Sequence, residues 1–115
     1  MATLRCGQQE LPPTFSNEFL AHLQVAVHER FGRGGGGFFL TGTYADSDGT
    51  ERTVSYWLAS NIPLEFSYDV RDDSGDRLPP VLLDHGEVEG MLEAMERPAG
   101  VHATSDVWLA FAERL

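Results

Sequence analysis

Three runs in the middle of the chain alternate apolar and polar residues, which is the pattern of β-strands that turn one face toward a core. Residues 45–49, Ala-Asp-Ser-Asp-Gly, suit a tight turn, so we predict that the first two runs form a hairpin. All three runs are predicted to be antiparallel strands. Their apolar positions are Phe38, Leu40 and Tyr44, then Val54, Tyr56 and Leu58, then Leu64, Phe66, Tyr68 and Val70.

Two other segments repeat apolar residues at the period of an α-helix. The first is predicted to begin after Ser16 as its N-cap and to end at Gly32, a residue typical of helix C-caps. The second begins at Asp84, carries Glu87 at the spacing of a capping box, and ends before Pro98. The two apolar stripes consist of Phe19, Leu20, Leu23, Ala26, Val27 and Phe31, and of Val88, Met91, Leu92 and Met95.

Shorter elements complete the predicted fold. Residues 3–6, 8–11 and 100–103 are predicted as short extended segments, and Ser105 as the cap of a final helix with Val107, Trp108, Phe111 and Leu115 on one side. We find no internal repeat and no linker, so residues 1–115 are predicted to form one domain. The expected class is α+β, an antiparallel sheet of four to five strands with two to three helices packed on it.

The composition agrees with a folded, water-soluble domain. Hydrophobic residues make up 42% of the chain, enough for a core, and no apolar run reaches the length of a membrane span. The first ten residues contain neither the apolar core of a signal peptide nor an amphipathic presequence. Cys6 is the single cysteine and cannot close an intrachain disulfide, so we expect a cytoplasmic protein.

The charge of the chain excludes several functions. A formal net charge of −10 repels nucleic acids and anionic membranes, so we expect neither as a partner.

All eight basic residues are arginines. Without lysine the chain cannot carry out Schiff-base catalysis or lysyl-nucleotide chemistry, and it lacks the lysine of a phosphate-binding loop.

Loop residues offer two weak signals for ligands. The glycine-rich residues 32–37 follow a helix and precede a strand, the reverse of the order in phosphate-binding loops, so we interpret them as a connector. The acidic loops could supply oxygen ligands to calcium, but a calcium loop counted from Asp46 would place Glu51 where glycine is needed and Trp57 where glutamate is needed. We therefore favour solvated turns. The acidic residues concerned are Asp46, Asp48 and Glu51, and Asp69, Asp72, Asp73 and Asp76.

Side chains able to act as nucleophiles, bases or metal ligands show no recognisable motif. His22 and His28 point about 120° apart on the first helix and cannot bind one metal together. His22 instead shares a stripe with Glu18 and Glu29 opposite the apolar arc, which we interpret as a solvent-exposed face. Cys6 is interpreted as a packing residue. We predict no catalytic residue, no metal site and no cofactor.

Two surfaces favour binding to another protein. Glu89, Glu93 and Glu96 line one flank of the second helix, where only Arg97 is placed to relieve their repulsion. A basic partner would relieve it too, although such a flank also serves solubility. Phe39 and Trp57 point to the sheet face opposite the core. Either the final helix covers these two rings or they form an interface with a partner or with a second copy of the chain.

A set of packing residues spaced along nearly the whole chain resembles a small family of unknown function, about a hundred residues long, from high-GC actinobacteria and their phages. They are Leu4 with Gly7, Leu20-Ala21-His22-Leu23-Gln24, Phe38-Phe39, and Trp57-Leu58 followed by Ile62-Pro63-Leu64 and Phe66. Members are sometimes labelled ATP-dependent DNA ligases, a label that a chain without lysine contradicts. Cys6 stands where the family usually has tyrosine, and the segment from Ser105 resembles an extension. The resemblance supplies no functional residue.

We therefore predict a non-catalytic, acidic protein-protein interaction module, with the resemblance adding a phage-encoded protein that acts on a host protein. A homo-oligomer is a further expectation. The alternative is a small ligand-binding or calcium-binding domain, or a minor hydrolase, that uses Asp72, Asp73 or a histidine.

Overall fold

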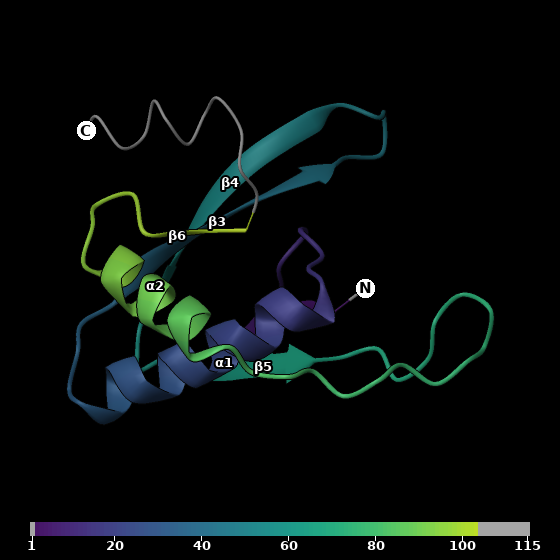
Figure 1. Ribbon diagram of the computed structural model, residues 1–115. Helices are drawn as coiled ribbons and strands as arrows, with labels where there is room; N and C mark the ends of the chain where they lie inside the picture. Colours follow the sequence, from purple (N-terminus) through teal and green to yellow (C-terminus); the bar gives the residue numbers. More distant parts are fainter. Residues whose placement is uncertain (1, 104–115) are drawn as a thin grey trace.

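The structure is a computed structural model that describes residues 2–103 (Figure 1). Helices and strands are mixed along that part of the chain, so the predicted α+β class is confirmed. The strands are β1 (Thr3–Cys6), β2 (Gln9–Glu10), β3 (Phe38–Ala45), β4 (Glu51–Leu58), β5 (Leu64–Ser67) and β6 (Val101–His102), and the helices are α1 (Asn17–Gly32) and α2 (His85–Met95). The helix predicted from Ser105 lies outside the described residues.

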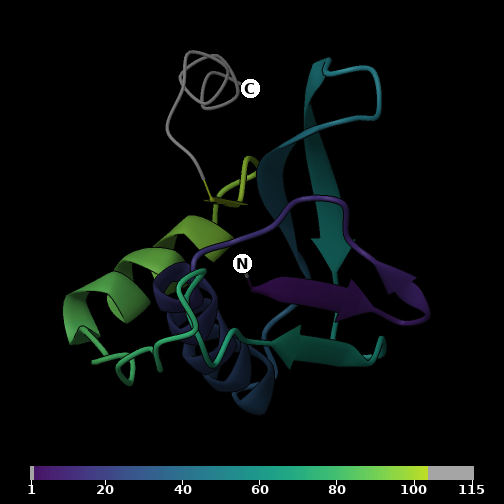
Figure 2. The same cartoon turned by 90° about the vertical axis from the view of Figure 1, so that its right-hand side faces the viewer.

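The strands form two sheets, and the prediction of one antiparallel sheet of four to five strands is wrong. The orders are β2-β1-β5 and β4-β3-β6. The predicted hairpin exists, with Phe38 opposite Leu58 and Ala45 opposite Glu51. The third alternating run leaves this hairpin and pairs with β1, in part because the Gly7 N–H donates to the carbonyl of Pro63 at 2.8 Å. Figure 2 shows the hairpin standing away from β1 and β5.

The β3–β6 pair departs from the predicted antiparallel arrangement because β6 runs parallel to β3. Gly100, directly before β6, has φ 74° and lies against the backbone of Phe39. A Cβ built on Gly100 would be 2.1 Å from the Phe39 carbonyl oxygen. Only glycine combines this conformation with so close an approach.

The predicted N-caps of both helices are confirmed. The Ser16 hydroxyl accepts the Phe19 N–H at 3.0 Å, and the Asp84 carboxylate accepts the N–H groups of Gly86 at 2.8 Å and Glu87 at 3.4 Å. These bonds satisfy amides that have no partner inside the helix. The helices pack against each other on one side of the sheets (Figure 2).

The core takes side chains from both sheets and both helices. Its largest fully buried apolar side chains are Leu4, Pro13, Leu20, Leu23, Phe38, Leu40 and Leu58. Val70, expected on the core face of the third run, is exposed instead, because β5 ends at Ser67. Neither helix within residues 2–103 combines the length and hydropathy needed to cross a membrane.

Candidate functional site

Two consecutive segments between β5 and α2 project from the core. We call residues 69–78 the arm and residues 79–83 the strap. The arm folds back on itself, because the Leu78 N–H donates to the Val70 carbonyl at 2.8 Å and the Asp72 carboxylate accepts the N–H groups of Ser74 and Asp76, both at 2.9 Å. Figure 1 shows the arm extending away from the body and the strap returning across α1 to α2.

The segment formed by the arm and the strap is tied to α1 at both of its ends by two polar side chains. Before the strap, the Asn17 amide donates to the Asp69 carbonyl at 2.8 Å and accepts the Asp69 N–H at 3.2 Å. After it, Nε2 of His22 accepts the Asp84 N–H at 2.8 Å. Asn17 and His22 are five positions apart, about 7.5 Å along a helix axis. The arm therefore starts, and the strap ends, over one short stretch of α1.

His22 is fully buried, so the prediction that it faces solvent with Glu18 and Glu29 is wrong. The prediction assumed that only the apolar arc of α1 is buried. In the structure α2 packs against another side of α1 and covers the imidazole. Nδ1 donates to the Glu18 carbonyl at 2.6 Å, since a carbonyl can only accept. The tie to Asp84 therefore uses the Nε2 lone pair.

Glu87, in the first turn of α2, adds a second contact to His22. One of its carboxylate oxygens lies 3.1 Å from Nε2. The Asp84 N–H needs a lone pair on Nε2, whereas a hydrogen bond to the Glu87 carboxylate would need a proton there, so Nε2 cannot make both bonds at once. The predicted capping-box role of Glu87 is replaced by this contact across the helix pair.

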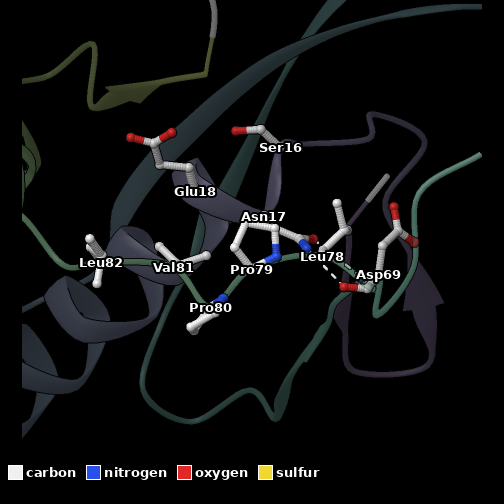
Figure 3. A pocket seen from close by; sticks show the side chains of 9 residues that line it. All are labelled: Ser16, Asn17, Glu18, Asp69, Leu78, Pro79, Pro80, Val81 and Leu82. Atoms are coloured by element: carbon white, nitrogen blue, oxygen red, sulfur yellow. Dashed lines mark hydrogen bonds between the residues drawn. The ribbon is translucent and has the colours of Figure 1, made fainter. Parts of the chain in front are cut away.

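A groove of about 480 Å³ runs between the strap and the first turn of α1. Figure 3 shows Asn17 at its centre, with the side chains of the strap on one side and Asp69 at one end. Its lining residues are Ser16, Asn17, Glu18, Asp69, Leu78, Pro79, Pro80, Val81 and Leu82. The strap thus forms an apolar wall beside a helix N-terminus.

The strap and arm expose large apolar side chains to solvent. Leu82 is 85% exposed and Leu83 is 57% exposed, and Val70 on the arm is also exposed. Within residues 2–103, the backbone N–H groups of residues 81–83 make no hydrogen bond, and Pro79 and Pro80 have none to donate. The strap therefore offers apolar side chains and unpaired backbone groups together.

The acidic flank predicted on α2 is exposed but partly neutralised. Glu93 pairs with Arg97 at 3.8 Å, and Glu96 pairs with Arg30 of α1. The expectation that only Arg97 relieves the repulsion is therefore wrong, because the packing of α2 on α1 brings Arg30 to the flank. Glu89 is exposed on the same helix. The binding role of this flank stays a prediction.

Phe39 and Trp57 point away from the core, as the alternation predicts. They are directly opposite each other in the β3–β4 ladder, with ring centroids 5.1 Å apart in an edge-to-face arrangement. Phe39 is 39% exposed and Trp57 is 52% exposed. Each ring therefore already covers part of the other. The helix predicted from Ser105, which was expected as one possible cover for these two rings, lies outside the described residues.

The carboxylates of the acidic loops stabilise their own turns. Asp46 accepts the N–H groups of Asp48 and Thr50 and the Arg52 guanidinium, at 3.3, 3.2 and 2.7 Å. Asp72 acts in the same way in the arm. Among residues 2–103, no three His, Cys, Asp or Glu side chains are arranged to hold a metal ion.

Asp48 is the loop carboxylate with the most altered acidity. A hydrogen bond shared with the Asp46 side chain, first, and hydrogen bonds donated by Thr50 lower its pKa from 3.8 to about 2. A lowered pKa in the folded state means that its contribution to stability is present above pH 3.8 and disappears as the pH falls through about 2. NMR titration of the Asp48 carboxyl carbon should give a midpoint near 2, rising in Thr50→Val. A midpoint of 3.8 in the folded protein would contradict these bonds.

The remaining candidate side chains are spread over the fold. Cys6 is half-buried in β1, His28 is exposed on α1 and His85 is exposed at the start of α2. Burial raises the pKa of the Tyr68 phenol. The Tyr68 hydroxyl donates a hydrogen bond to the Gln24 side chain at 2.6 Å. That bond joins the residue after β5 to α1 and is structural.

Sequence reasoning did not identify the strap or the roles of Asn17 and His22. One signal was present: Pro-Pro-Val-Leu-Leu between an acidic loop and the cap of α2 is an apolar run without a partner strand. An apolar run that proline excludes from a sheet interior lies at an edge or on the surface. The ties of Asn17 and His22 join residues 52 and 62 positions apart, so no local pattern encodes them.

The described residues define a class: a small α+β domain with two three-stranded sheets and an apolar surface groove. The chain belongs to the family described as Domain of unknown function (DUF7882), whose model matches residues 1–106. This agrees with the resemblance to a family of unknown function. Comparisons with curated proteins and with solved structures give no match.

Proposed function

We propose that this domain is a non-catalytic module that binds another protein through the strap and its groove. The proposal depends mainly on one observation: two leucines of the strap are exposed although the segment formed by the arm and the strap is tied to α1 at both of its ends. An apolar segment held in water is costly to keep and is typical of an interface. Because hydrogen bonds to α1 already order the strap, less conformational entropy would be lost when a partner binds.

The free energy available from burying the exposed leucines is large enough for an interaction surface. Full burial of one leucine side chain contributes about 1.5–3 kcal/mol. Leu82 and Leu83 together, with the groove beside them, therefore supply a useful share of the affinity of a specific complex. The other two candidate surfaces are less available. Arg30 and Arg97 already pair with glutamates of the acidic flank, and Phe39 and Trp57 already cover part of each other.

Capture of a partner from a lysate of a high-GC host bacterium tests the proposal. The double variant Leu82→Ser and Leu83→Ser should weaken capture roughly a hundredfold, since about tenfold is expected per leucine. Both side chains are exposed, so the circular dichroism spectrum and Tm should stay close to those of the unmodified protein.

The matched control reverses charge on the predicted acidic flank. Glu89→Arg with Glu93→Arg should change capture only a fewfold, because these residues are on the exposed side of α2 and outside the groove. Capture that survives the serine variant but is lost on charge reversal would place the partner on α2 and reject the strap.

We further propose that the module acts in the cytoplasm on a host protein. The single cysteine supports the compartment, because nothing in the chain needs an oxidising environment. The host protein as target rests on the resemblance to a family found in actinobacteria and their phages. Partner identification by mass spectrometry in the capture experiment tests both points.

A further inference from the structure

We propose that the strap and groove recognise an extended, basic segment of the partner in which apolar residues alternate with arginine or lysine. This inference rests on the proposed function, since it names the chemistry of the partner at the same site. It follows from three properties of the strap: its side chains, its backbone and the charge around it.

The side chains select an apolar partner. Val81 is half-buried, Leu82 and Leu83 are both exposed, and Val81 and Leu82 line the groove, so the strap presents a continuous apolar strip along one wall of the groove. In an extended partner, successive side chains point to opposite sides, so every second residue would face this strip. Apolar side chains of an extended partner, two residues apart, can therefore meet Leu82 and the groove.

The backbone selects an extended partner. The N–H groups of residues 81–83 have no hydrogen bond within the described part of the chain. Extended segments with unpaired backbone groups pair with another extended chain, as sheet edges do. Pro79 and Pro80 lack an N–H, so pairing through donors of the strap is confined to the three residues before Asp84.

The charge around the strap selects a basic partner. Six acidic residues and two arginines are found between residues 69 and 87, and Glu18 adds an exposed carboxylate on the wall of the groove. Arg71 is turned back into the arm, where it donates to the Gly75 carbonyl at 3.0 Å. An apolar strip inside an acidic surround complements a segment with the opposite charge and the same apolar pattern.

Three short capped peptides test the proposal by NMR titration of the isotope-labelled protein. The first alternates leucine with arginine, the second replaces its leucines by serine, and the third replaces its arginines by glutamate. The first should bind at least about tenfold more tightly than either control. Its amide shifts should be confined to residues 81–83, the arm and the first turn of α1, and Leu82→Ser with Leu83→Ser should weaken it by a similar factor.

Each other outcome overturns the inference. Equal binding of the serine peptide would mean attraction by charge alone, and equal binding of the glutamate peptide would mean that charge has no role. Amide shifts at Phe39 and Trp57 would locate the peptide on the outward face of the β3–β4 hairpin instead of the strap. Absence of binding by all three peptides would reject the partner chemistry, whereas the proposed function fails only if capture survives the serine variant of the strap.

Discussion

Replacing His22 with alanine should lower the free energy of unfolding by about 3 kcal/mol, one of the two largest effects we expect in this domain. The imidazole is fully buried, so its loss leaves a cavity between α1 and α2. The Asp84 N–H also loses its acceptor, and the loss of such a part-buried hydrogen bond costs about 0.5–1.5 kcal/mol. For a domain of this size the Tm should fall by roughly 12 °C.

His28→Ala is the matched control, because His28 is an exposed histidine on the same helix. It should change stability by no more than about 0.5 kcal/mol. Hydrogen exchange gives a local readout: the Asp84 amide should exchange faster in the His22→Ala protein, since its bond to Nε2 is gone. Similar losses of stability in the two variants would show that His22 is not the tie between α1 and the strap.

Replacing Gly100 with alanine should destabilise the domain by a comparable amount, at least about 3 kcal/mol. The φ of 74° disfavours any side chain, at a cost of about 1–2 kcal/mol. The new methyl carbon would also lie 2.1 Å from the Phe39 carbonyl oxygen, and only separation of β6 from β3 relieves that contact. Thermal and urea unfolding of the variant measure the loss.

Gly90→Ala provides the control for this substitution. Gly90 is exposed on α2 and has open space around the position of a Cβ. Alanine is a better helix former than glycine by about 1 kcal/mol, so this variant should be more stable than the unmodified protein. An alanine at position 100 that left the Tm unchanged would contradict the close approach of Gly100 to β3.

The elements that could be predicted from the sequence are those encoded locally. Ser16 and Asp84 cap their helices through neighbouring amides, so the cap residues alone located both helix starts. The β3–β4 hairpin follows from two alternating runs and the turn between them. The outward direction of Phe39 and Trp57 follows from the same period.

The partners of these elements could not be predicted, because periodicity encodes which face is buried and not what covers it. The run from Leu64 alternates in the same way whether it pairs with the hairpin or with β1. His22 lies on the polar side of the helical wheel, yet α2 covers that side. The strap escaped prediction because Pro79 and Pro80 interrupt any regular period.

The central claim is that the partner contacts the strap, and site-specific photocrosslinking tests it most directly. A photoreactive phenylalanine analogue is placed at Leu82, Trp57 or Glu93, three exposed positions on three different surfaces. We predict a covalent adduct with the partner from position 82 and none from positions 57 and 93. An adduct from either of these two, with none from position 82, would contradict the claim.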